Sequence, residues 1–198
     1  MAQPTGRDRI LEATYACVAR YGLAKTTVED AAREAGLSRA TVYRYFPGGK
    51  DQLIAEVIAW EAQRFFVRLA DAVSGADSFA RLVEDALVFA HQAVAKHEVL
   101  QKILVTEPDR LLPQLTLEGA RLKQLITAFL RGRLPADQLR PGVSEEEAAD
   151  YVARMVLSYI NGSGRWDLTD RNQVRELVRA EITAPLFADV PGDTVRRD

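Results

Sequence analysis

The chain has 198 residues, of which 47% are hydrophobic and 27% charged, and its formal net charge is -2. This length allows a sizeable core without disulfides or a structural metal, and the composition indicates a globular rather than a disordered protein. No apolar run reaches the length of a membrane span and the N-terminus lacks the apolar centre of a signal peptide, so we expect a cytoplasmic protein with no membrane partner.

The charge is unevenly distributed along the chain. Residues 1–50 carry eight basic and five acidic side chains, a net charge of +3, which leaves -5 for the remainder. A basic N-terminal part on an acidic body is typical of a protein in which one end contacts phosphate. A segment of this charge also arises often by chance.

Apolar residues recur at helical spacing, and no run of β-branched residues alternates with period two, so we predict an all-α fold. A first helix should run from about Arg7 to Tyr21, with Tyr21 on its apolar stripe, and Gly22 should end it. Cys17 lies inside this apolar pattern, which favours a buried, reduced thiol over a reactive or metal-bound one.

A second and a third short helix follow. The second has Val28, Ala31, Ala32 and Ala35 on one face, and Gly36 ends it; Thr26 and Glu29 have the spacing of a capping box. In the third, Ser38 can cap the first turn, Leu37 can pack on Val42, and the "PGG" at 47–49 breaks the helix.

The remaining sequence predicts six longer helical segments separated by Pro and Gly. Pro113 lies inside one pattern, so that helix should begin there or be kinked. The segments are 50–73, 78–96, 97–106, 109–132, 144–162 and 171–187.

The third helix presents an unusual outward face. At 100° per residue, Val42 and Phe46 share the inner side, whereas Ala40, Thr41 and Arg44 lie outward. Arginine can offer paired donors to guanine, small residues can approach a thymine methyl, and hydroxyls can bind phosphate. The two helices and their Gly-containing turn therefore fit a helix-turn-helix, although a solvated corner of a helical bundle fits the spacing as well.

The segment "TVEDAAREAGLSRATVYRYF" resembles the DNA-binding head of TetR-like transcriptional regulators. The positions that fit the family pattern are Thr27, Val28, Ala32, Ala35, Gly36, Ser38, Ala40, Thr41, Val42, Tyr43 and Phe46. Three features depart from it: Ala31 replaces a larger Ile, Ala40 stands where Gly is frequent, and "FPGGK" carries one residue more than the usual link into the fourth helix, which affects the aim of Lys50.

The resemblance implies an N-terminal three-helix head with a helix-turn-helix in residues 1–50, and a helical bundle for effector binding and dimerisation in residues 51–198. It assigns Arg39, Ala40 and Arg44 to base contacts, and Thr27, Ser38, Thr41, Tyr43, Tyr45 and Lys50 to phosphate. Arg7 and Arg9 could form an arm beside the duplex or remain ordinary surface residues.

The segment 144–162 is apolar on most sides, so it must be covered on more than one. One face could meet a partner subunit, together with the last helix; burial within a monomer is the alternative. The resemblance favours a homodimer with two heads on a pseudo-palindromic DNA operator, and implies that a bound effector shifts the fourth helix as a lever.

Large apolar residues of the middle helices are candidates for an effector pocket, although each could be plain core. They favour a small apolar or amphipathic effector over a sugar or nucleotide. The candidates are Phe89, Leu100, Ile103, Leu104, Leu115, Leu122, Leu125, Phe129, Met155 and Tyr159, with Leu112 and Trp166 considered beside them.

Other function classes find less support. His91 and His97 are six residues apart and do not share a helix face, so no metal or other cofactor is predicted. There is no phosphate loop, nucleophile elbow or paired acid motif, so we do not expect an enzyme. A ligand-responsive regulator, most simply a repressor, is the leading hypothesis; a helical ligand-binding or protein-interaction module without specific DNA binding is the alternative.

Overall fold

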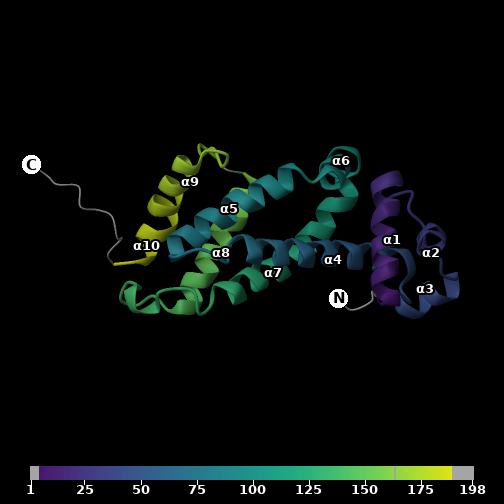
Figure 1. Cartoon of the computed structure of the whole chain (residues 1–198), viewed down its shortest axis with the longest axis horizontal. Helices are drawn as coiled ribbons and strands as arrows, with labels where there is room; N and C mark the ends of the chain where they lie inside the picture. Colours follow the sequence, from purple (N-terminus) through teal and green to yellow (C-terminus); the bar gives the residue numbers. More distant parts are fainter. Residues whose placement is uncertain (1–4, 163, 189–198) are drawn as a thin grey trace, which may run out of the picture. The chain divides into compact units, whose positions relative to one another are not determined.

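A computed structural model describes residues 5–162 and 164–188, with the side chains of 115–118 and 161 excluded (Figure 1). These residues are helical and contain no strand, only an isolated antiparallel bridge between Leu139 and Phe187. The all-α prediction is therefore confirmed. The elements are α1 (Gly6–Tyr21), α2 (Val28–Ala35), α3 (Arg39–Tyr45), α4 (Gly49–Ala72), α5 (Phe79–Ala95), α6 (Glu98–Thr106), α7 (Pro108–Leu130), the 3-10 helix η1 (Ala136–Gln138), α8 (Glu145–Asn161), α9 (Arg171–Leu177), the π-helix η2 (Val178–Thr183) and α10 (Ala184–Leu186).

The chain forms two compact units. One comprises Met1–Val67 and Ala95–Gly119, and the other Arg68–Val94 and Ala120–Asp198, so α4 and α7 contribute to both. In the first unit, α6 and the start of α7 group with α1, α2 and α3. The functional division at residue 50 remains a prediction.

Local capping sets the start of the first two helices. The Thr5 hydroxyl and Asp8 form a capping box on α1, which ends at Gly22 with φ +85° as predicted. The capping box of α2 is formed by Thr27 and Asp30, not by Thr26 and Glu29. The prediction was one residue early because Thr26 is buried and donates its hydroxyl to the Gly22 carbonyl (2.7 Å).

The core of the head is built from the inner faces of α1, α2 and α3, with residues of α4. Its buried members are Ile10, Leu11, Ala13, Val28, Ala31, Ala32, Ala35, Val42, Phe46, Leu53 and Val57. Cys17 is buried as predicted, and burial raises the pKa of its thiol. Tyr21 is not on the buried stripe: it is 40% exposed at the end of α1, where the Arg20 guanidinium covers its ring.

A second apolar cluster in the same unit joins α6 to α1 and α4. Ile103 of α6 and Leu111 of α7 are buried with Val18 of α1, Ile54 of α4 and the loop residue Leu23. Figure 1 shows α6 beside one end of α1. The α7 helix begins at Pro108, a favourable first-turn position for proline, and runs through Pro113, so a start at Pro113 was wrong.

The second unit surrounds α8. Ala149 and Ala153, on the wide apolar face of α8, are fully buried within the single chain. The predicted helix 171–187 is present, but its middle is the π-helix η2. There the Glu181 carboxylate accepts hydrogen bonds from the hydroxyl of Tyr159 and from Trp166 Nε1 (2.9 Å).

No described helix combines the length and apolar character that crossing a bilayer would require.

Candidate DNA interface

The outward face of α3 is created by the burial of its inner face. Ser38 Oγ accepts a hydrogen bond from the Thr41 backbone N–H (3.1 Å) and so starts the helix. Val42 and Phe46 are each 1% exposed, as the sequence predicted. The remaining positions of this short helix therefore face away from the head core.

The turn between α2 and α3 is compact. Gly36 adopts a left-handed conformation with φ +65°, and the backbone N–H of Leu37 donates to the Ala32 carbonyl (2.9 Å). The buried face of α2 includes three alanines, and such short side chains allow neighbouring backbones to approach closely. Arg9 of α1 donates to the Ala35 carbonyl (2.8 Å), which fixes the end of α2.

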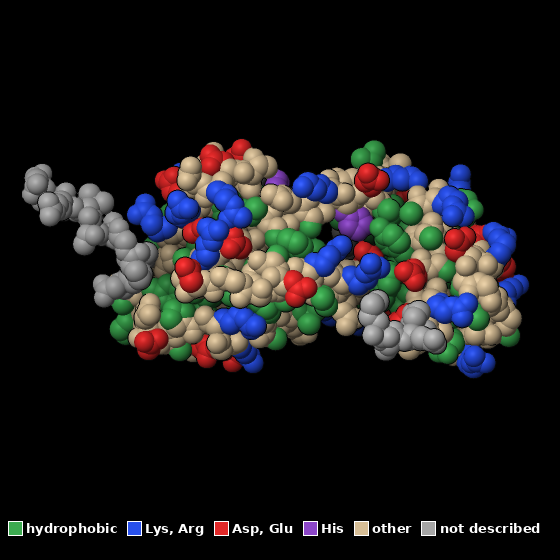
Figure 2. All heavy atoms as spheres, in the orientation of Figure 1, with side chains coloured by type: hydrophobic (Ala, Val, Ile, Leu, Met, Phe, Trp, Pro, Cys, Tyr) green, Lys and Arg blue, Asp and Glu red, His purple; other side chains and the backbone are tan. Residues whose placement is uncertain are grey.

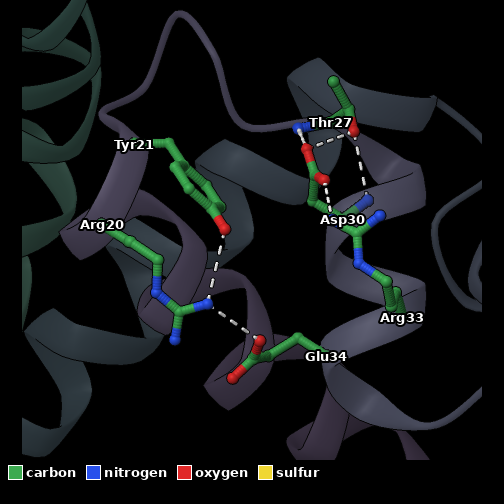
Figure 3. A network of polar contacts seen from close by, with 6 residues as sticks. All are labelled: Arg20, Tyr21, Thr27, Asp30, Arg33 and Glu34. Atoms are coloured by element: carbon green, nitrogen blue, oxygen red, sulfur yellow. Dashed lines mark hydrogen bonds and ion pairs between the residues drawn. The ribbon is translucent and has the colours of Figure 1, made fainter.

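Figure 3 shows polar contacts at both ends of α2, one of which joins it to α1. Arg20 at the end of α1 pairs with Glu34 of α2 (3.3 Å). At the other end of α2, Asp30 accepts from the Thr27 hydroxyl (2.6 Å) and pairs with Arg33 (2.5 Å). The pKa of Asp30 is lowered, first by the Thr27 hydroxyl and also by Arg33, so this carboxylate stays ionised.

The two arginines of α3 have different surroundings. Arg39 pairs with Glu29 of α2 (2.8 Å) and lies over the Tyr43 ring; its pKa is raised, first by a hydrogen bond with Tyr43 and then by Glu29. Arg44 lies over the Tyr45 ring, and within the described residues it pairs with no carboxylate. Of the two arginines of α3, Arg39 therefore holds an ion pair with a described carboxylate and Arg44 does not.

Several predicted phosphate-binding groups also have structural partners. The Thr27 hydroxyl is part of the α2 capping box, and the hydroxyls of Ser38 and Thr41 bond to each other (2.9 Å). Tyr43, Tyr45 and Ala40 are exposed.

Lys50, in the first turn of α4, already has a hydrogen-bond partner within the head. Its Nζ donates to the Ala24 carbonyl in the loop between α1 and α2 (2.6 Å). This partner was not apparent from the sequence, and neither was the pairing of Glu29 with Arg39, because both depend on how the helices pack.

In Figure 2, the region of α2 and α3 bears several Lys and Arg side chains with acidic side chains among them. The arm candidates Arg7 and Arg9 are partly engaged: Arg7 pairs with Glu56 (2.5 Å) and Arg9 with the Ala35 carbonyl. A mixed surface of this kind allows sequence-dependent contacts without a strong general attraction to phosphate.

Six of the effector-pocket candidates fall into two groups. Leu100, Ile103 and Leu104 belong to the apolar cluster of α6 in the first unit, whereas Phe129, Met155 and Tyr159 pack in the second unit's core. Leu122 and Phe89 are partly buried, and Leu125 is 50% exposed. The side chain of Leu115 lies outside the described residues.

His97 has a role in helix capping. Nδ1 of His97 accepts from the Leu100 backbone N–H (3.1 Å), so His97 caps α6. In the described part of the chain, no three His, Cys, Asp or Glu side chains are grouped in a way that could hold a metal ion.

Comparison with known proteins places this head in a family. The model of bacterial regulatory proteins of the tetR family matches residues 10–57, which include α2 and α3. An uncharacterised HTH-type transcriptional regulator of Mycobacterium tuberculosis is 26% identical over 180 residues, covering 89% of this chain and 85% of the relative.

Solved structures share the fold over almost the whole chain. The TetR family repressor AlkX from Dietzia sp., implicated in biodegradation of n-alkanes, is 19% identical with a TM-score of 0.65, covering 93% of this chain and 98% of AlkX. A structure described as the molecular basis for control of antibiotic production by bacterial hormones is 26% identical with a TM-score of 0.58, covering 94% and 100%. Residues 10–57 thus match the DNA-binding head of the tetR family, and over most of its length the chain is similar to TetR-like transcriptional regulators.

Proposed function

We propose that the protein is a ligand-responsive repressor that binds a pseudo-palindromic operator as a homodimer. The observation that carries the proposal is the outward face of α3, where Arg44 stands without a carboxylate partner among the described residues, next to the small Ala40. A helix with this face can enter a major groove and offer paired donors to guanine.

Dimerisation would use exposed surface of the second unit. Ala149 and Ala153 of α8 are already buried within the chain. The interface would therefore be formed by the partly exposed residues of α8, such as Leu157 and Ile160, and by the outer face of α9, which carries Arg175 and Glu176. Two heads related by a two-fold axis read two half-sites of an operator.

The proposed effector is a small apolar or amphipathic molecule. Its candidate contacts are Phe129, Met155 and Tyr159, which adjoin the core of the second unit. The relative described in connection with bacterial hormones supports a small-molecule response. The effector must bind the DNA-incompetent arrangement better than the competent one, and DNA must weaken effector binding by the same factor.

The test is selection of preferred duplexes from a random-sequence pool by the full chain, followed by fluorescence anisotropy at two salt concentrations. We expect one inverted repeat to be enriched and to bind in preference to a scrambled duplex of the same composition. If no sequence is enriched and all binding vanishes at moderate salt, the alternative without specific DNA binding is favoured, since that behaviour is purely electrostatic.

Once the enriched duplex is in hand, apolar compounds can be screened for release of the protein from it. Release at a concentration that leaves the fold intact would support the effector class. Binding of the same compounds without any change in DNA affinity would argue against a ligand-responsive repressor.

A further inference from the structure

The loop that joins α1 to α2 is held by charged side chains from other parts of the first unit. Both backbone polar groups of Ala24 have charged partners: its N–H donates to Glu107 Oε2 (2.6 Å), and its carbonyl accepts from Lys50 Nζ (2.6 Å). Lys102 of α6 donates to the Ala19 carbonyl in the last turn of α1 (2.9 Å). Hydrogen bonds to charged groups are stronger than neutral ones, so these contacts fix the loop firmly.

Gly22 makes room for the Glu107 carboxylate. A Cβ at residue 22 would collide with Glu107 Oε1, while the other carboxylate oxygen accepts a hydrogen bond from the Ala24 N–H. Gly22 also has φ +85°, which side-chain-bearing residues rarely adopt. A glycine at residue 22 therefore serves two purposes: it leaves space for the Glu107 carboxylate and it allows the positive φ of the turn.

An apolar contact accompanies this polar one. Leu23, the residue between Gly22 and Ala24, is buried in one cluster with Ile103 of α6 and Ile54 of α4. Glu107 is the residue after α6, and its backbone N–H ends that helix by donating to the Ile103 carbonyl. The next residue, Pro108, begins α7. The corner between α6 and α7 thus contacts the loop twice, through the buried Ile103 side chain and through the Glu107 carboxylate.

We propose that Glu107 is a positioning residue for DNA recognition, through which the α6–α7 corner holds the loop that leads into α2. The inference rests on the proposed function, because it assumes that α2 and α3 bind DNA. A loop released from Glu107 would let the head sample more orientations, and binding would then have to restrict them at a cost in affinity.

The experiment compares full-length Glu107→Ala and Glu107→Gln with the unmodified protein on the selected duplex. We expect Glu107→Ala to bind about 3- to 30-fold more weakly, since a hydrogen bond to a charged group is lost. Glu107→Gln keeps an acceptor for the Ala24 N–H and should restore most of the affinity.

A matched control separates this effect from charge. Asp109→Ala removes a carboxylate two residues away on the exposed first turn of α7. Removing a negative charge should leave DNA affinity unchanged or slightly higher, because repulsion from phosphate falls. A folded Glu107→Ala variant with affinity equal to the Asp109→Ala control would overturn the proposal.

Hydrogen exchange provides a readout that needs no DNA. In Glu107→Ala the amide of Ala24 should exchange faster, whereas the amides in the middle of α1 should not change. Unchanged exchange of the Ala24 amide would show that Glu107 does not hold the loop, even if DNA binding fell. If the unmodified protein prefers no duplex, the proposed function fails, and the Ala24 amide still decides whether Glu107 holds the loop.

Discussion

At the scale of single residues, the candidate DNA interface depends on what each polar group already contacts. Arg39 is held by Glu29, whereas Arg44 is covered only by Tyr45 among the described contacts. An exposed ion pair is worth little in stability, but it orients a flexible side chain. We therefore expect Arg39 to be presented in a fixed direction and Arg44 to adapt to the base it meets.

Replacing Arg44 with Ala should reduce affinity for the selected duplex by about 1–3 kcal/mol if Arg44 reads a base. Affinity for the scrambled duplex should fall less, because base contacts carry the sequence preference. Anisotropy titrations on both duplexes measure the difference. Arg110→Ala, an exposed arginine on α7, is the charge-matched control. Equal losses on both duplexes would make Arg44 a phosphate contact.

Replacing Gly22 with Ala should lower the free energy of unfolding by about 1–3 kcal/mol, because the residue must keep a positive φ. The new Cβ should also expel the Glu107 carboxylate from the Ala24 N–H. The two substitutions Gly22→Ala and Glu107→Ala should therefore be non-additive, which chemical denaturation of the single and double variants can measure. Full additivity would show that residue 22 and Glu107 do not share this contact.

At the scale of elements, three helices begin with the same device. Each of these helices begins with a capping box: the hydroxyl of the capping residue accepts a hydrogen bond from a backbone N–H in the first turn, and a carboxylate in that turn accepts one from the capping residue's own backbone N–H. The pairs are Thr5 with Asp8, Thr27 with Asp30, and Ser144 with Glu147. The pKa of each carboxylate is lowered by the hydrogen bonds of its capping residue. The native state thus keeps these groups ionised at a pH where the unfolded chain takes up protons.

This stabilisation is complete above the ordinary carboxyl pKa of 3.8 for Asp30 and is lost as the pH falls through the lowered native value. Asp30→Asn cannot titrate, so its free energy of unfolding should change less between pH 7 and about pH 3 than that of the unmodified protein. Urea denaturation at the two pH values tests this. Identical pH dependence in both proteins would mean that Asp30 contributes nothing to acid sensitivity.

The C-terminal helical stretch depends on Glu181 in the π-helix. Removing its carboxylate would leave the hydroxyl of Tyr159 and the indole N–H of Trp166, both on buried residues, without their acceptor. Glu181→Ala should lower the free energy of unfolding by about 1–3 kcal/mol, and Glu181→Gln by less. The control is Glu176→Ala, which removes an exposed carboxylate of α9. If Glu181→Ala lowers the free energy of unfolding no more than Glu176→Ala does, Glu181 does not stabilise this stretch.

At the scale of the whole molecule, the proposed reading of an inverted repeat would require two heads. A single three-helix head contacts one half-site, and its affinity would come largely from phosphate. We expect sedimentation equilibrium to give the mass of two chains and titration to give two chains per inverted repeat. A monomer that binds one half-site with full affinity would contradict the dimer.

The sequence by itself determined the local features of this protein: the helical class, the helix ends at Gly22 and Gly36, and the inward face of α3 with Val42 and Phe46. These follow from periodicity and capping, which act over a few residues. Its resemblance to TetR-like regulators was also readable from the same short segment, and the family model confirms it.

Only the tertiary structure decided which partners the polar groups take. Thr26 and Thr27 are adjacent threonines with equivalent capping chemistry, and burial of Thr26 assigns the cap to Thr27. The contact between Glu107 and Ala24 joins residues 83 positions apart. A carboxylate's partner at that separation is set by how α6 packs on α1 and α4, and no local pattern in the sequence encodes it.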